Sequence, residues 1–286
     1  MGNSTKEKLE YLKHAAHSLR MDVVEMFHAS GKGHIGGSLS IVEIMTALYF
    51  HILRVDPENP KWPDRDRLVL SKGHASATWY AALSAKGFFP KDLLFTDYMK
   101  IDGKLQEHSD MNKVPGVEMS SGALGQGLSV GLGMCLAGRL AKRDYRVYVI
   151  LGDGELQEGQ AWEAFMAAGH YHANTLTALI DYNKLQVCST VSQIMELEPL
   201  AQKIEAFRWN VVEIDGNNME EVVSALERAR DNTTEQPTAI ICNTVKGKGI
   251  SFIENNVQWH SHAFSEEDYQ KARKELVGME EKRGRG

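Results

Sequence analysis

Two short polar motifs follow apolar runs of the chain, and their residue types suit metal binding. Gly152-Asp153-Gly154 comes directly after one run, and Asn183 comes shortly after the next. An Asp carboxylate and an Asn amide oxygen are hard ligands of the kind that Mg²⁺ or Ca²⁺ takes. Flanking glycines allow close approach of a ligand, and a helix beginning near Leu156 would turn its N-terminus toward a diphosphate. The pattern fits a metal-bridged diphosphate and equally a tight turn with an aspartate helix cap.

Two glycine-rich segments are weaker candidates for phosphate binding. Gly125, Gly127 and Gly131 have the spacing G-x-G-x-x-x-G, which differs from the dinucleotide-binding fingerprint. For residues 122–133 we therefore favour a helix with small residues on one face over a nucleotide-binding loop. Lys246 and Lys248 alternate with glycines after a predicted strand, and we expect them to be solvated loop lysines.

The histidines fall into two groups according to the element that would carry them. Four are expected within helices and are interpreted as structural or surface residues: His14, His17, His28 and His51. Four others are expected in loops near strand ends, where binding groups concentrate: His34, His74, His108 and His260. This second group predicts a proton-handling cleft. The His-x-His pairs at 170–172 and 260–262 have no nearby cysteine or second spaced pair, so we do not expect zinc.

The elements that must position these residues alternate along the chain. The apolar patterns predict helices at 4–29, from 38 or 40 to 53, at 156–171 and at 218–230, and strands at 67–71, 146–151, 176–181, 210–215 and 237–245. Ser40 and Glu43 have the spacing of a capping box for the second helix. Nearly continuous apolar strands between helices predict an α/β fold, with a parallel central sheet and helices on both faces. Ligands of such sheets bind beyond the carboxyl ends of the strands.

Composition and length narrow the class of protein. The 286 residues are 43% hydrophobic with a formal net charge of -6, which argues against a nucleic-acid-binding surface. The first twenty residues lack the apolar core of a signal peptide, and no run is long enough to span a membrane. The three scattered cysteines suit a reducing compartment, so we expect a cytoplasmic protein. No linker divides residues 1–286, which are expected to form one domain with a frayed, charged tail at 280–286.

At this point the chain resembles the transketolase family over almost its whole length. The shared motifs occur in transketolase order: SGKGH at 30–34, LSKGH at 70–74, PGVE at 115–118, SGALGQG at 121–127, GDGELQEG at 152–159, DYNK at 181–184, VKGKG at 245–249 and WH at 259–260. The resemblance is to the thiamine diphosphate-binding (PP) domain, and in particular to the stand-alone N-terminal subunit of a split enzyme. It implies the thiamine-diphosphate-binding fold.

The resemblance also assigns roles to individual residues. It implies that Mg²⁺, or Ca²⁺ or Mn²⁺ in its place, is held by Asp153, the Asn183 side chain and the Leu185 carbonyl. On the cofactor side it places His74, Gly152 and Gly154 near the diphosphate, with Asn183 at the end bound to the metal. It places Gly122, Ala123 and Leu124 near the thiamine. Glu158 would belong to a carboxylate network at the subunit boundary. The residues that would face the sugar and handle protons are His34, His108 and His260.

The activity implied by the resemblance is transfer of a two-carbon ketol unit from a ketose phosphate to an aldose. It implies a separate C-terminal, pyrimidine-binding subunit in an α2β2 assembly, with no nucleic acid or membrane as partner. The sequence departs from the family at Glu107-His108-Ser109, where Gly-His-Pro is common. Alternatives are a deoxyxylulose-phosphate-synthase-like subunit, a 2-oxoacid-dehydrogenase-like subunit and a non-catalytic paralogue.

Overall fold

The central element is a five-stranded parallel sheet. The computed structural model of the chain describes residues 2–283. The strands lie in the order β2 (Arg67–Leu70), β3 (Val147–Gly152), β4 (Leu176–Tyr182), β6 (Thr238–Asn243) and β5 (Asn210–Asp215), each parallel to its neighbours. The predicted parallel sheet is therefore confirmed, with strand bounds within a few residues of those expected.

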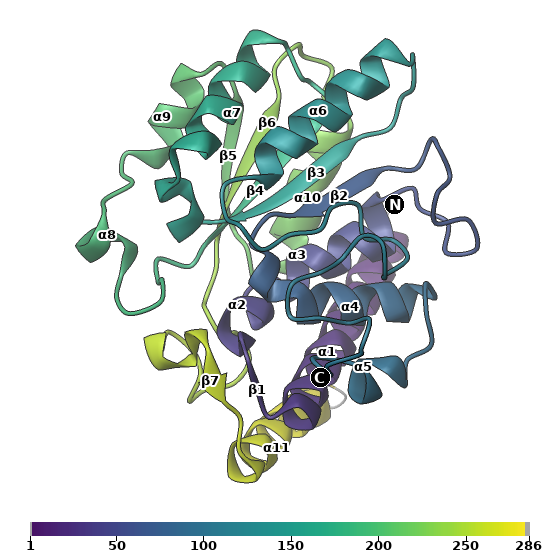
Figure 1. Cartoon of the computed structure of the whole chain (residues 1–286), viewed down its shortest axis with the longest axis vertical. Coiled ribbons are helices and arrows are strands. Elements are labelled where there is room, and N and C mark those ends of the chain that lie inside the picture. Colours follow the sequence, from purple (N-terminus) through teal and green to yellow (C-terminus); the bar gives the residue numbers. More distant parts are fainter. Residues whose placement is uncertain (1, 284–286) are drawn as a thin grey trace.

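Helices cover both faces of the sheet because each central strand is apolar on both sides (Figure 1). Alternate residues of β3 enter two separate cores: Val149 lies in one, and Ile150 in the other. The first core also contains α6 (Gly127–Leu140), α7 (Gly159–His170) and α9 (Leu200–Ala206). The second contains α1 (Gly2–Ser30), α3 (Val42–Ala47), α4 (Ser76–Lys86) and α10 (Met219–Arg230).

The prediction of one helix ending near residue 53 is wrong, because the helical segment begins earlier than expected and is divided into three parts. The chain forms α2 (Ile35–Leu39), then α3, and then a π-helical turn, η1 (Leu48–Ile52). The Ser40 hydroxyl donates to the Asp181 carboxylate at 2.7 Å, and Glu43 accepts from the Arg20 guanidinium at 2.6 Å. The expected capping box is absent because both of its side chains have tertiary partners instead.

The glycine-rich segment at 122–133 is helical only from Gly127 onward. Gly125 has φ +79°, which favours glycine, and its amide donates to Glu155 Oε1 at 2.8 Å. Within α6, a side chain at Gly131 would place its Cβ only 2.5 Å from Val149 of β3. The expected small-residue face is therefore confirmed for α6, where it allows close packing on the sheet, whereas residues 122–126 form a loop.

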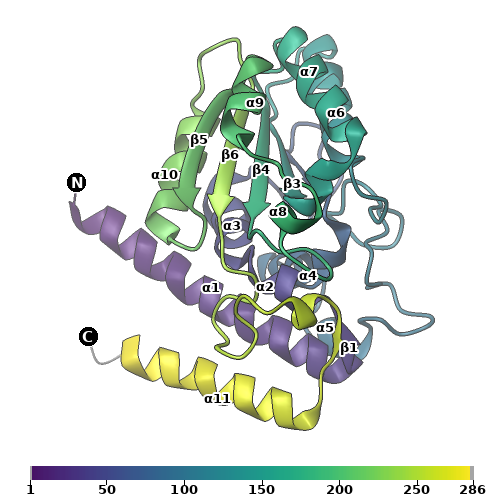
Figure 2. The ribbon, with the colours of Figure 1, turned by 90° about the vertical axis from the view of Figure 1, so that its left-hand side faces the viewer.

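Several elements were not expected from the sequence. A two-stranded antiparallel ribbon joins β1 (Lys32–Gly33) to β7 (His262–Ala263), and α11 (Glu266–Arg283) packs along α1 (Figure 2). The tail expected at 280–286 is helical as far as Arg283, and residues 284–286 lie outside the described part. Short helices are α5 (Leu93–Thr96) and α8 (Val191–Ile194). No helix within residues 2–283 is long and apolar enough to cross a membrane.

Candidate active site

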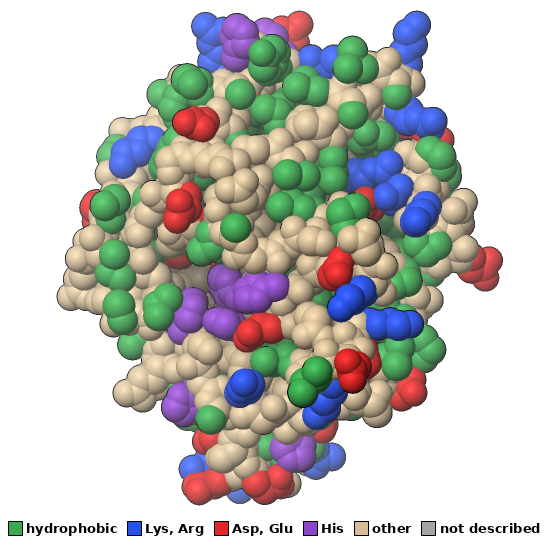
Figure 3. Space-filling view, in the orientation of Figure 1, with side chains coloured by type: hydrophobic (Ala, Val, Ile, Leu, Met, Phe, Trp, Pro, Cys, Tyr) green, Lys and Arg blue, Asp and Glu red, His purple; other side chains and the backbone are tan. Residues whose placement is uncertain are grey.

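The four loop histidines predicted to share a cleft lie together. His74 is carried by the 3₁₀ turn η2 (Gly73–Ala75) and His260 by η4 (Val257–His260), whereas His34 immediately precedes α2 and His108 lies in the loop before the glycine segment. The His34 ring centroid is 5.1 Å from His74, 5.2 Å from His260 and 6.5 Å from His108. Histidine side chains gather in a hollow on this face of the molecule (Figure 3).

Two of these imidazoles are held in their neutral form. Burial lowers the pKa of His74 well below its usual value, and the Lys72 ammonium acts in the same direction. Burial also lowers the pKa of His260 to about 3, with a further contribution from the Lys246 ammonium. A neutral imidazole can both donate and accept a hydrogen bond, so the cluster suits recognition of hydroxyl groups at neutral pH.

At the carboxyl edge of the sheet, β3 and β4 bring the candidate metal ligands together. Gly152 of β3 is in register with Asp181 of β4, so the residues that follow the two strands meet. One Asp153 oxygen accepts from the Gly154 amide at 2.7 Å, and the other accepts from the Lys184 amide. Burial, together with the nearby Asp181 carboxylate, raises the pKa of Asp153 to about 7.

The oxygen ligands at this edge suit a hard divalent ion that also takes oxygen ligands from a second molecule. A carboxylate, an amide oxygen and a backbone carbonyl come from Asp153, Asn183 and Leu185, and the first two side chains are buried. Asp153 also caps the 3₁₀ turn η3 (Gly154–Gln157), so the helix-cap interpretation holds as well. In residues 2–283, no three His, Cys, Asp or Glu side chains form a metal-binding cluster. Diphosphate oxygens would have to complete the coordination.

A buried ion pair that sequence reasoning missed lies behind the candidate metal ligands. Lys72 and Asp181 are both buried and form an ion pair, and Thr244 also donates to the Asp181 carboxylate. Asp181 Oδ2 accepts from the Asn183 amide nitrogen at 3.0 Å. This contact fixes which way the Asn183 side chain points, because it leaves the amide oxygen on the opposite side. Both residues lie in motifs already noted, Lys72 in LSKGH and Asp181 in DYNK, but nothing in the sequence indicated that they pair.

Lys246 is not the solvated loop lysine expected from the sequence. The residue is 2% exposed, and its ammonium donates to the Leu185 carbonyl at 3.0 Å and to His260 Nδ1 at 2.8 Å. Burial lowers the pKa of Lys246 to about 8. Lys246 thus links the strand-end residues to the histidine cluster.

The glycine loop and the two glutamates after Asp153 complete the site. Gly122 lies against His108, since a Cβ at Gly122 would be 3.5 Å from that ring. Gly125 packs against Glu158 in the same way. Glu155 is buried and accepts from the Ser71 hydroxyl and from the amides of Gly125 and Gly152. Both oxygens of its carboxylate therefore hold these loops together.

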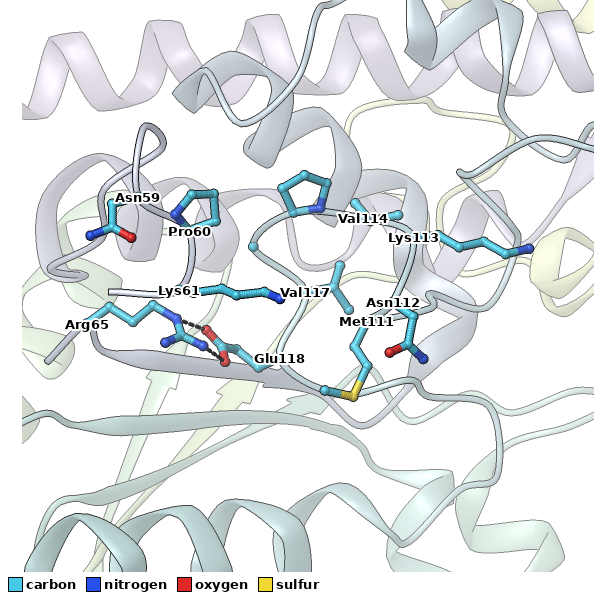
Figure 4. Close-up of a pocket in the computed structure, with 12 residues that line it drawn as sticks. Asn59, Pro60, Lys61, Arg65, Met111, Asn112, Lys113, Val114, Val117 and Glu118 are labelled. Carbon is cyan, nitrogen blue, oxygen red and sulfur yellow. Dashed lines mark hydrogen bonds and ion pairs between the residues drawn. The ribbon is translucent and has the colours of Figure 1, made fainter. Parts of the chain in front are cut away.

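Cavities lie both beside this edge of the sheet and elsewhere on the molecule. One of about 640 Å³ is lined by Asn183 and Leu185, at the carboxyl ends of β4, β5 and β6. Another of about 720 Å³ lies between residues 59–65 and 111–118 (Figure 4). An ion pair between Arg65 and Glu118 joins its walls, with Nε and Oε1 2.6 Å apart. The residues lining this second cavity include none of the predicted site residues.

Comparison with known proteins places the chain in a family. Residues 11–284 match the family model "Transketolase, thiamine diphosphate binding domain". The chain belongs to this family. It is 46% identical over 266 residues to a 6-deoxy-6-sulfo-D-fructose transketolase subunit of Clostridium sp., covering 93% of this chain and 96% of that protein. It is 40% identical over 275 residues to an apulose-4-phosphate transketolase subunit of Phocaeicola vulgatus, covering 96% and 97%.

Solved structures agree with this membership. The transketolase of Campylobacter jejuni superimposes with a TM-score of 0.87 at 30% identity, covering 94% of this chain and 43% of that one. The thiamine-diphosphate-binding fold expected from the sequence is thus confirmed. The chain matches separate transketolase subunits along their whole length but full transketolase chains along less than half.

Proposed function

We propose that this chain is the cofactor-binding subunit of a thiamine-diphosphate- and Mg²⁺-dependent transketolase. Residues 1–286 would form one domain, act in the cytoplasm and move a two-carbon ketol unit from a ketose phosphate to an aldose. The meeting of the four loop histidines carries the proposal, because Lys246 joins one of them, His260, to the Leu185 carbonyl, one of the candidate metal ligands at the strand ends. The names of the subunit-sized relatives support the same reaction class.

Each group of residues then has a part in the reaction. Asp153, Asn183 and the Leu185 carbonyl would hold Mg²⁺, with Ca²⁺ or Mn²⁺ as substitutes. Gly152, Gly154, His74 and Gly122–Leu124 would bind the cofactor, which when bound stabilises the negative charge that develops on the transferred unit. His34, His108 and His260 would orient the sugar hydroxyls and move protons at its carbonyl oxygen.

A separate partner subunit would complete this site. In the family, a glutamate of the pyrimidine-binding domain activates the cofactor. Glu155 is committed to hydrogen bonds with its own loops, which supports a glutamate from another chain. Glu158 would belong to a carboxylate network at the subunit boundary. We propose an α2β2 assembly with the cofactor between unlike subunits.

Reconstitution tests this proposal directly. The chain is coexpressed with the matching pyrimidine-domain subunit, and the pair is assayed for ketol transfer. The donors are ordinary ketose phosphates, branched ketose phosphates and sulfonated ketoses. We expect activity with the pair and none with either subunit alone. Turnover of a 2-oxoacid without ketol transfer would instead favour a dehydrogenase-like subunit, and absence of thiamine diphosphate binding by the pair would favour a non-catalytic paralogue.

A further inference from the structure

The histidine cluster contains one acidic side chain that the family motif does not provide. Glu107 stands where glycine is common, directly before His108, and its Oε1 lies 2.7 Å from His34 Nδ1. Both side chains are partly buried, with 19% of His34 and 28% of Glu107 exposed. Solvent therefore competes only weakly for this contact, which joins two loops 73 positions apart in the chain.

The charge of Glu107 determines which partner gives the proton. The His34 contact lowers the pKa of Glu107, and the charges of His108 and Lys32 contribute in the same direction. An ionised carboxylate can only accept, so His34 Nδ1 must carry the hydrogen. A neutral imidazole has one ring hydrogen, and His34 Nε2 is then left with a free lone pair.

The opposite arrangement holds at His260. There the Lys246 ammonium has hydrogens to donate and no lone pair, and it lies 2.8 Å from His260 Nδ1. His260 Nδ1 consequently accepts, which places the ring hydrogen on Nε2. The two rings are 5.2 Å apart and differ in the nitrogen that carries hydrogen.

We propose that Glu107 is a positioning residue that fixes the His34 tautomer, so that His34 Nε2 accepts a proton from the donor sugar. The inference deepens the proposed function and rests on it for the identity of the substrate. A carboxylate behind an imidazole holds the ring in one orientation and stabilises the imidazolium formed when Nε2 takes a proton. In this step the sugar hydroxyl gives one proton to His34 Nε2, and the electron pair of the broken O–H bond stays on the sugar oxygen. The imidazolium later returns the proton, and Glu107 keeps its charge throughout.

No other described side chain forms a hydrogen bond with the His34 ring. The titratable groups that face it from the neighbouring elements are His74, His108 and His260, besides Glu107. Of these, His74 and His260 are kept neutral by burial. The Glu107 carboxylate is therefore the one negative group within the described residues that contacts the ring.

Glu107→Gln tests the proposal, and Glu266→Gln is a matched control. Glu266 makes the same kind of contact with His28, with Oε2 and Nε2 2.7 Å apart, but on the outer side of α1. In the assembled enzyme, Glu107→Gln should lower kcat on the order of 10–10²-fold with a smaller change in the KM of the donor. Glu266→Gln should leave both constants unchanged, and Glu107→Asp should recover part of the loss.

A second measurement does not depend on the reaction. Nitrogen-15 NMR of the imidazole rings in the full chain, with His34 assigned by its loss in His34→Asn, reports the tautomer at about pH 8. We expect hydrogen on Nδ1 in the wild type and a larger fraction on Nε2 in Glu107→Ala, because alanine leaves no acceptor beside Nδ1, whereas the amide oxygen of Glu107→Gln can still accept that hydrogen. Hydrogen on His34 Nε2 in the wild type, or an unchanged kcat in Glu107→Gln, would overturn the inference. If the wild-type pair lacks ketol transfer altogether, the proposed function fails, while the tautomer measurement still decides the role of Glu107.

Discussion

The two halves of the site are built in different ways. At the strand ends, Asp153 and Asn183 take their places from β3 and β4, and the buried Lys72–Asp181 ion pair supports them from behind. The histidine cluster instead draws its members from four loops that are distant in the sequence. The first half depends on the sheet and the second on contacts between loops.

The two halves also differ in the charges that surround their titratable groups. In the strand-end half, burial and the Asp181 carboxylate raise the pKa of Asp153 to about 7, so a bound cation would favour its ionised form. In the histidine half, burial lowers the pKa of His74 and of His260, and the ammonium groups of Lys72 and Lys246 act in the same direction. Under the proposed function, the strand-end half would anchor a cation and its diphosphate, and the histidine half would present neutral rings to a substrate.

Removing the anchoring charge should have the largest effect. Under the proposed function, Asp153→Ala deletes the charged ligand of an ion that would also hold the diphosphate, so the affinity of the assembled enzyme for thiamine diphosphate with Mg²⁺ should fall by several kcal/mol. Isothermal titration calorimetry measures this change. Folding should survive, because the unpaired carboxylate is itself costly to bury.

Asp144→Ala is the control for this experiment. Asp144 lies before β3, at the opposite end of that strand from Asp153, and 82% of its side chain is exposed, with Arg54 as its ion-pair partner. Its replacement should leave cofactor affinity unchanged. Equal affinities of the wild type and Asp153→Ala would show that Asp153 is only a helix cap.

Changes in the histidine half should affect turnover rather than cofactor binding. His34→Ala and His260→Ala should each lower kcat of the assembled enzyme by about 10²–10⁴-fold, the usual range for a general acid or base. Steady-state kinetics and calorimetry on the same preparations separate the two effects. Cofactor loss with normal donor kinetics would assign these residues to the anchoring half instead.

The control for the histidine variants is His14→Ala. His14 lies on α1 with 69% of its side chain exposed, near Glu280 of α11. Its replacement should be nearly neutral for both turnover and cofactor affinity. A loss comparable to that of His34→Ala would mean that the histidine variants act through general destabilisation.

The sequence predicted the strand-end half more completely than the loop half. Apolar periodicity located β3 and β4, and parallel pairing then placed Asp153 beside Asn183. Four loop histidines could be proposed to share a cleft, but the partners of each ring could not be read from the sequence. The contacts of Glu107 with His34 and of Lys246 with His260 depend on how loops fold over the sheet edge. Tertiary partners also replaced the local capping box expected at Ser40 and Glu43.

The smallest expected effect concerns how the two halves respond to acid in the cofactor-free chain. The pKa of Asp153 is raised from 3.8 to about 7, so between pH 7 and 5 the folded chain takes up a proton that the unfolded chain does not, and this group adds stability. The pKa of His260 is lowered from 6.5 to about 3, so over the same interval the unfolded chain takes up the proton, and stability is lost.

Urea unfolding at both pH values, in the presence of a chelator, separates these contributions. We take the change in the free energy of unfolding from pH 7 to pH 5 for the wild type as the reference. Asp153→Asn removes a group that stabilises the folded chain in acid, so this change should become more negative by about 2 kcal/mol. His260→Asn removes a group that destabilises the folded chain in acid, so the change in the free energy of unfolding should become more positive by about 1 kcal/mol. This value is smaller because the ring is partly exposed to solvent. Because the two carry opposite signs, shifts in the same direction in both variants would contradict the division of the site into a cation-seeking half and a neutral half.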